Sequence, residues 1–184
     1  MSRLKDPREH DDFLNYRIKR LLTLGAAPAI RLCEGRYGVA RMEWRLVAAL
    51  HEDGAMPLGK LVLRSGIDQA RVSRAVARMV EHGFMQRRPD EDAGRRMVVC
   101  LTDAGHSLYL ELFPQLAAIN RRLMEALDET EALALEDYLQ RLTQRALEIH
   151  HSGGGVEERT ERRLGGSQRH WRRHGARSSV PGAA

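Results

Sequence analysis

The segment 57–102 constrains the fold of this chain more than any other, because helical and strand patterns alternate within it at short spacing. Two short amphipathic stretches, 57–64 and 69–81, are separated by Ser65-Gly66-Ile67. A three-residue turn that contains glycine is typical of two helices joined as a helix-turn-helix pair. Asp68 stands at the N-cap position of the second helix, where its carboxylate can accept a hydrogen bond from a first-turn N–H. Ile67 is expected to anchor the turn to the core.

A β-hairpin is predicted directly after the second helix. Residues 96–101 alternate their side chains as a strand does, and 84–88 forms a second short segment beside them. The connecting loop, 89–95, contains a proline and a glycine, which favour a turn. An arginine at the tip of such a loop has the right shape to enter the minor groove of DNA when the preceding helix occupies the adjacent major groove.

The second helix of the pair separates apolar from basic side chains. Its apolar face is formed by Val72, Ala75, Val76, Met79 and Val80. Arg71, Arg74 and Arg78 recur at i, i+3 and i+7, so they share another helical face. An arginine can pair with the guanine edge in the major groove or clamp a phosphate.

Positive charge is concentrated in two segments of the chain. The formal net charge is +5 at pH 7. Residues 60–102 hold nine basic and five acidic residues, and residues 152–184 hold seven arginines and three glutamates. Each segment therefore carries +4, while the remainder is weakly acidic. This concentration indicates a polyanionic partner.

The rest of the chain reads as helices around this unit. Apolar residues recur at helical spacing across 10–35, and Gly25 and Pro28 predict a kink or a break within that run. Further helices are expected over 41–53, over about 103–127 after a Thr102 cap, and over 129–148.

The last segment, 152–184, is rich in glycine and arginine and poor in large aliphatic residues, so it is predicted to be disordered. No apolar run approaches the roughly 20 residues that span a bilayer. The N-terminus lacks the apolar stretch of a secretory signal. These patterns predict a cytoplasmic protein without membrane contact.

Taken together, these segments resemble the MarR family of bacterial winged helix-turn-helix transcriptional regulators. The resemblance spans about 10–150 and is carried by EWRLVAAL (43–50), ARVSR (70–74), MVEHGFMQRRPD (79–90) and GRRMVVCLTDAG (94–105). It implies a mainly α fold with a small antiparallel β-hairpin wing. In that scheme a MarR-type domain covers 10–151, with the winged helix-turn-helix at about 41–102. Dimerisation helices occupy about 10–36 and 103–151, and a disordered basic tail occupies 152–184.

The resemblance also implies a function. A homodimer would bind double-stranded DNA at a pseudo-palindromic operator, most often as a repressor, and a small aromatic or phenolic ligand would release it. The implied major-groove contacts are Gln69, Ala70, Arg71, Ser73 and Arg74. Arg95 would enter the minor groove, and Arg88, Arg96 and Lys60 would touch phosphate. Two positions depart from the family pattern: Ala93 replaces an aspartate that braces the wing arginine, and Ala40 replaces a serine or threonine helix cap.

Candidate ligand-binding residues are less well defined. Trp44 is interpreted as a core residue first and a pocket residue second. Arg45, Tyr16 and Tyr37 are weaker candidates for holding an anionic ligand. Cys33 is interpreted as structural rather than as an oxidant sensor, because a reactive thiol needs access and a lowered pKa.

The sequence predicts neither an enzyme nor a cofactor or metal site, since no nucleophile–base pair or phosphate-cradling loop is present and two cysteines are too few for a zinc site. The alternative to a DNA-binding regulator is a helical dimer that binds a ligand or protein without reading DNA. Salt separates the two, because DNA binding weakens steeply as salt rises.

Overall fold

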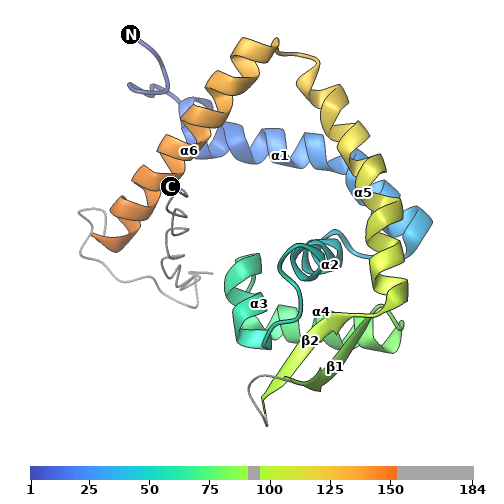
Figure 1. Ribbon diagram of the computed structural model, residues 1–184. Helices are drawn as coiled ribbons and strands as arrows, with labels where there is room; N and C mark the ends of the chain where they lie inside the picture. The colour runs from blue at the N-terminus through green and yellow to red at the C-terminus, as the bar shows by residue number, and fades with distance from the viewer. Residues whose placement is uncertain (91–95, 153–184) are drawn as a thin grey trace, which may run out of the picture.

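The computed structural model of the protein describes residues 1–90 and 96–152. Its elements follow the order η1 (His10–Asp12), α1 (Leu14–Arg31), η2 (Leu32–Arg36), α2 (Arg41–Asp53), α3 (Leu58–Ser65), α4 (Gln69–Glu81), β1 (Met85–Pro89), β2 (Met97–Leu101), α5 (Asp103–Met124) and α6 (Glu129–His151). In Figure 1, α2, α3, α4 and the hairpin form one lobe, while α1, α5 and α6 form an open three-sided frame above it. The predicted fold class is confirmed for the described residues.

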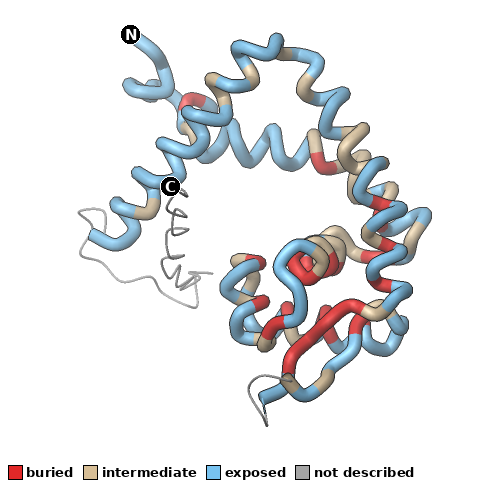
Figure 2. The backbone as a smooth tube through the Cα atoms, in the orientation of Figure 1, coloured by how far each residue is buried: buried red, intermediate tan, exposed pale blue. Residues whose placement is uncertain are grey.

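The core lies in the lobe of α2, α3, α4 and the hairpin (Figure 2). Its most deeply buried side chains include Leu46 and Leu50 of α2, Leu61 of α3, and Val72 and Val76 of α4. Ile67 packs against this cluster from the turn, as predicted. The apolar faces of three short helices therefore converge on one small core, which fixes the angle between them.

The hairpin is antiparallel, and the segment between α2 and α3 extends it. Met85 pairs with Leu101 at one end and Pro89 with Met97 at the other. Met56 forms an isolated bridge to Val99, with backbone N···O distances of 3.1 and 2.9 Å. The strands are thereby joined to the helices by backbone hydrogen bonds as well as by packing.

Local signals set the boundaries of α2, α3 and α4. The Ala40 N–H donates to Glu43 Oε2 at 2.8 Å, so a glutamate side chain caps α2 where a serine or threonine is absent. α3 ends at Gly66, whose φ of +64° is a left-handed conformation that glycine adopts without steric cost. Asp68 Oδ1 accepts the Arg71 N–H at 3.0 Å, which confirms the predicted N-cap of α4.

Of the kink or break predicted in the first helix, the break is wrong. α1 runs through Gly25 and Pro28 to Arg31 and then widens into the π-helical turn η2. A proline removes only one backbone donor. Gly25 lies where α1 meets α5, and a Cβ atom there would sit 3.4 Å from Leu123 Cδ2. That distance is an ordinary van der Waals contact, so Gly25 lies against α5 and does not end α1.

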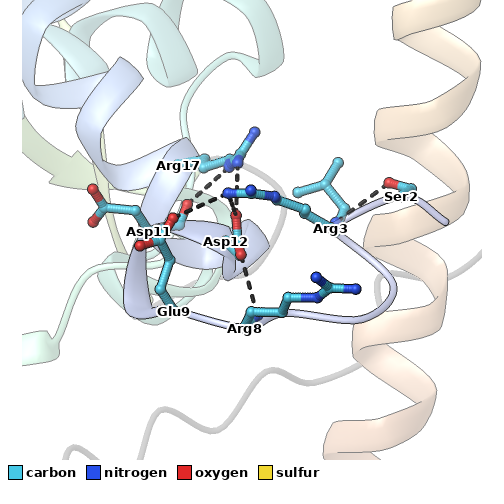
Figure 3. A network of polar contacts seen from close by, with 8 residues as sticks. Ser2, Arg3, Arg8, Glu9, Asp11, Asp12 and Arg17 are labelled. Atoms are coloured by element: carbon cyan, nitrogen blue, oxygen red, sulfur yellow. Dashed lines mark hydrogen bonds and ion pairs between the residues drawn. The ribbon is translucent and has the colours of Figure 1, made fainter.

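A polar network ties the N-terminal segment to α1 (Figure 3). Asp12 is 1% exposed and accepts hydrogen bonds from the Arg8 N–H and from Arg17 Nη2, both at 3.1 Å. Arg3 Nη1 lies 4.0 Å from Asp12 Oδ1. The Arg8 amide, followed by the nearby arginine charges, holds the pKa of the Asp12 carboxyl below its usual value, despite the opposing effect of burial.

The frame helices bury little of their own apolar surface. α6 has no buried residue, and in α1 only Ala26 is buried. Large apolar side chains stand exposed along both helices (Phe13, Ile18, Leu21, Leu22, Leu24, Leu133, Leu139, Leu142 and Ile149). Within the described part of the chain, no helix has the length and apolarity required to cross a membrane.

Candidate nucleic-acid interface

One side of α4 is exposed along its N-terminal half. The buried side consists of Val72, Ala75, Val76 and Met79. Gln69, Ala70, Arg71 and Arg74 are exposed, and Ser73 is half-buried. In the described residues, the Arg74 guanidinium has no hydrogen bond or ion pair. This face therefore presents a cation, an amide and small side chains to solvent beside the helix N-terminus.

Arg78 lies on the same helix but is engaged within the protein. Its Nε atom lies 3.1 Å from Glu43 Oε1, and its Nη2 atom donates to the Gly38 carbonyl at 2.8 Å. Glu43 is 3% exposed. The sequence placed Arg78 on the same face as Arg71 and Arg74. In the structure its guanidinium instead connects α4 to the start of α2.

The hairpin extends the basic surface. Arg88 is half-buried on β1 opposite Val98, and Arg96 is exposed directly before β2. Lys60 is exposed on α3. The predicted wing arginine, Arg95, and the departure at Ala93 lie outside the described residues. The cations that the structure does describe come from α3, α4 and the base of the hairpin.

The four candidate ligand residues do not meet in one place within the chain. Trp44 is half-buried and packs against the core from α2. Arg45 donates to the Ser65 carbonyl at 2.7 Å, and this bond satisfies the C-terminal end of α3. Tyr16 lines a separate hollow on α1 with Arg17, Arg20 and neighbouring leucines. Tyr37 bonds to Gln115 of α5.

An aromatic stack that the sequence reasoning missed joins α2 to α5. Tyr109 stacks on Trp44 with ring centroids 5.3 Å apart and on His51 at 3.7 Å. Phe113 extends the stack at 5.3 Å from Tyr109. Burial, followed by the negative charge of Glu52, raises the pKa of Tyr109. The i, i+4 spacing of Tyr109 and Phe113 was the available signal, since it places both rings on one face.

Neither the thiols nor the histidines form a metal or redox centre in the described residues. Cys33 is completely buried, and burial, followed by the charge of Glu34, raises the pKa of its thiol. His51 Nδ1 and His106 Nδ1 lie 3.1 Å apart. No group of three or more His, Cys, Asp or Glu side chains in the described ranges is placed to hold a metal ion.

The helix-turn-helix of α3 and α4, with the hairpin and the supporting helix α2, defines a winged helix-turn-helix protein. Residues 37–96 match the sequence model of the MarR family. Many solved structures with this fold are MarR family transcriptional regulators. The predicted resemblance to the MarR family is therefore confirmed.

Individual solved structures agree with this placement. A probable transcriptional regulator from Pseudomonas aeruginosa is 28% identical, with a TM-score of 0.63 over 73% of this chain and 99% of that chain. A MarR family regulator from Silicibacter pomeroyi is also 28% identical, with a TM-score of 0.62 over 73% and 95%. Bordetella bronchiseptica BpsR shares the fold at 21% identity, with a TM-score of 0.66 over 74% and 97%. A comparison with curated proteins found no match.

Proposed function

We propose that this protein is a sequence-specific regulator that binds double-stranded DNA. The observation that carries the proposal is the exposed face of α4, where Arg74 has no partner among the described residues and lies next to Gln69 and Ala70. An arginine on the exposed face of a helix can donate two hydrogen bonds to a guanine edge. The opposite face of α4 is buried, so the orientation of the helix is fixed by the core.

The proposed contacts fall into three groups, according to the part of the DNA that each residue touches. Gln69, Ala70, Arg71, Ser73 and Arg74 face the major groove. Arg95 enters the adjacent minor groove, while Arg88, Arg96 and Lys60 contact phosphates. Phosphate contacts supply most of the affinity and position the lobe, whereas base-edge contacts supply the choice of sequence.

The protein acts as a homodimer in this proposal. A 23-residue helix without a buried residue, α6, and an 18-residue helix with only one, α1, leave two apolar faces exposed. Helices of this kind derive their stability from burying an apolar face against a partner. A second copy placed on α1 and α6 covers both faces. A two-fold dimer presents two α4 helices to DNA, which requires a pseudo-palindromic operator.

A small aromatic ligand controls DNA binding in this proposal, and the protein acts as a repressor. The Trp44–Tyr109 stack supplies an aromatic surface between the DNA-binding lobe and α5. The structural study of BpsR describes regulation of that protein's DNA binding by 6-hydroxynicotinic acid. A ligand that binds better when the two α4 helices are wrongly spaced weakens DNA binding by the difference between its two affinities.

Fluorescence anisotropy on the DNA upstream of the protein's own gene tests the assignment. Binding is compared with a scrambled duplex at two salt concentrations. We expect tighter binding to the native duplex at both salts. Arg74→Ala should cost about 1–3 kcal/mol on the native duplex and less on the scrambled one. Arg122→Ala, which removes an exposed arginine near the far end of α5, is the matched control and should leave both affinities unchanged.

Two results would contradict the proposal. Absence of binding to any duplex would favour the alternative, a helical dimer that does not read DNA. The second result is salt-sensitive binding that is equally tight for both duplexes and is not weakened by Arg74→Ala. In that case the arginines would contribute only non-specific electrostatic attraction to DNA. Sedimentation equilibrium tests the dimer separately. Leu142→Glu should shift the protein towards monomer. Gln140→Glu on the same helix is the control and should produce a smaller shift towards monomer.

A further inference from the structure

A hollow beside α4 gathers three arginines from two helices. Its volume is about 250 Å³, and its lining comes from the start of α2, the turn between α3 and α4, and the first turn of α4. The lining residues are Arg41, Met42, Arg45, Gly66, Ile67, Asp68 and Arg71. Sites that bury drug-sized ligands occupy roughly 300–1,000 Å³ and are mostly apolar. This hollow is smaller and strongly basic, so it suits a compact anion.

The positive charges around the hollow are not balanced by acidic side chains of the described residues. The Arg41 guanidinium makes no hydrogen bond or ion pair with any described residue. Glu43, the acidic residue in the first turn of α2, is occupied by Arg78 and by the Ala40 N–H. Asp68 uses Oδ1 to cap α4, and its Oδ2 atom is 3.9 Å from Arg71 Nε. Three guanidinium groups therefore face a single carboxylate that already has a structural role.

The position of these cations opposes the stability of α2. Arg41 is the first residue of the helix, where the macrodipole disfavours positive charge. Arg45 lies four residues further along, and like charges at i and i+4 repel one another. An anion bound between the two side chains removes both penalties.

Arg45 and Arg71 have geometries that suit the same anion. Arg45 Nη2 donates to the Ser65 carbonyl at 2.7 Å, which fixes the guanidinium beside the turn and leaves its other N–H groups available. Arg71 extends from the first turn of α4. It lies on the helix that the proposed function places in the major groove, next to the phosphates that border the groove.

We propose that Arg41, Arg45 and Arg71 together bind one backbone phosphate of operator DNA. The inference rests on the proposed function and deepens it by giving two arginines of α4 different roles. Arg71 contacts the phosphate at the groove edge, whereas Arg74 reads base edges. Arg41, which precedes the helix-turn-helix in sequence, becomes part of the DNA-binding surface.

Salt dependence of DNA binding by the full chain tests this assignment. Each phosphate contact contributes about 0.9 to the slope of log K against log salt concentration. Because Arg45 and Arg71 still face the shared phosphate, Arg41→Gln should lower that slope by less than about 0.9 and leave the ratio of native to scrambled affinity unchanged. Arg74→Ala should lower the ratio instead. Arg31→Gln, an exposed arginine at the end of α1, is the matched control and should change neither quantity.

A second measurement locates the phosphate. A set of native duplexes is prepared in which a single linkage is a neutral methylphosphonate. The wild-type protein should lose affinity when the methylphosphonate replaces one particular linkage in each half-site. Arg41→Gln should lose less affinity at that same linkage, because one of its three arginine contacts is already absent. If Arg41→Gln matches the wild type in affinity, slope and methylphosphonate profile, the phosphate site is overturned while the proposed function stands.

Other outcomes separate the remaining explanations. If the wild type binds no duplex, the proposed function fails and the phosphate site fails with it. Inorganic phosphate is the probe for a free anion. If it raises the melting temperature of the wild type but not of Arg41→Gln, and the two proteins have equal salt slopes, the hollow binds a free anion and the DNA assignment is overturned.

Discussion

Arg78 of α4 pairs with Glu43 of α2 at a distance of 3.1 Å between Nε and Oε1. The Glu43 side chain is 4% exposed, and its second oxygen accepts the Ala40 N–H at 2.8 Å. One carboxylate therefore caps α2 and fixes α4 against it. The orientation of the proposed recognition helix depends on this ion pair as well as on the apolar core.

Removal of Arg78 should destabilise the lobe. Arg78→Ala leaves the buried Glu43 carboxylate without its cationic partner, with only the Ala40 N–H still donating to it. Loss of one member of a fully buried pair costs about 3–5 kcal/mol. Because the Arg78 side chain is 48% exposed, we expect a smaller loss, about 1–3 kcal/mol. Urea denaturation measures this loss. Arg74→Ala is the control, since Arg74 makes no hydrogen bond or ion pair with the residues that the structure describes.

A double-mutant cycle distinguishes this mechanism from general damage to α4. Glu43→Gln keeps an oxygen for the Ala40 N–H and removes the buried charge. Arg78→Ala combined with Glu43→Gln should cost less than the sum of the two single variants. Strict additivity would contradict a direct interaction between the two side chains.

The elements of the lobe could be predicted because each boundary has a local signal. Gly66 ends α3, Asp68 begins α4, and Thr102 Oγ1 accepts the Gly105 N–H at 3.1 Å at the start of α5. These residues act on backbone groups within three or four positions. Reasoning from sequence spacing can therefore find them without knowledge of the tertiary structure.

Partners that are distant in sequence could not be predicted in the same way. Helical periodicity places Arg78 on one face with Arg71, but only the packing of α4 against α2 brings it to Glu43. The stacking of Trp44 on Tyr109 likewise depends on how α5 crosses α2. α1 continues through Gly25 and Pro28 to Arg31, against the local signal of both residues.

Gly105 occupies a position that excludes any side chain. An ideal Cβ atom there would lie 2.1 Å from the Phe84 carbonyl oxygen and 3.2 Å from Leu101 Cβ. Gly105→Ala therefore has to displace the start of α5 from β1 and β2. We expect it to lower the unfolding free energy by about 1–3 kcal/mol, as overpacking of a core does.

The matched control for this substitution is Gly59→Ala. Gly59 lies in α3, and a Cβ atom there would have no neighbour within 4 Å. An alanine in a helix is favoured over glycine by up to about 1 kcal/mol, so this variant should melt at or above the wild-type temperature. If both variants melt at the same temperature as the wild type, the close approach at Gly105 is contradicted.

Cys33 should be unreactive in the folded protein. Its side chain is completely buried, and its pKa is raised, so at neutral pH the thiolate fraction is below that of an ordinary cysteine. A thiol-reactive chromogenic disulfide should modify the Cys100→Ala variant slowly at pH 7.5 and rapidly in urea. Fast modification of the native variant that also abolishes DNA binding would instead identify Cys33 as an oxidant sensor.

The Asp12 network should respond to acid. The folded-state pKa of Asp12 lies below the ordinary 3.8, chiefly because the Arg8 N–H donates to its carboxylate. A carboxyl whose pKa is lower in the folded than in the unfolded protein stabilises the fold fully at pH values above its unfolded-state pKa. This contribution is lost as the pH falls through the folded-state pKa. An NMR titration of the Asp12 carboxyl should give a midpoint below 3.8, and Arg17→Ala should raise it, because Arg17 Nη2 donates to the same carboxylate at 3.1 Å. Arg20→Ala, on the same helix, is the control and should leave the midpoint unchanged. A wild-type midpoint at or above 3.8 would mean that the N-terminal segment is not held on α1 by this carboxylate.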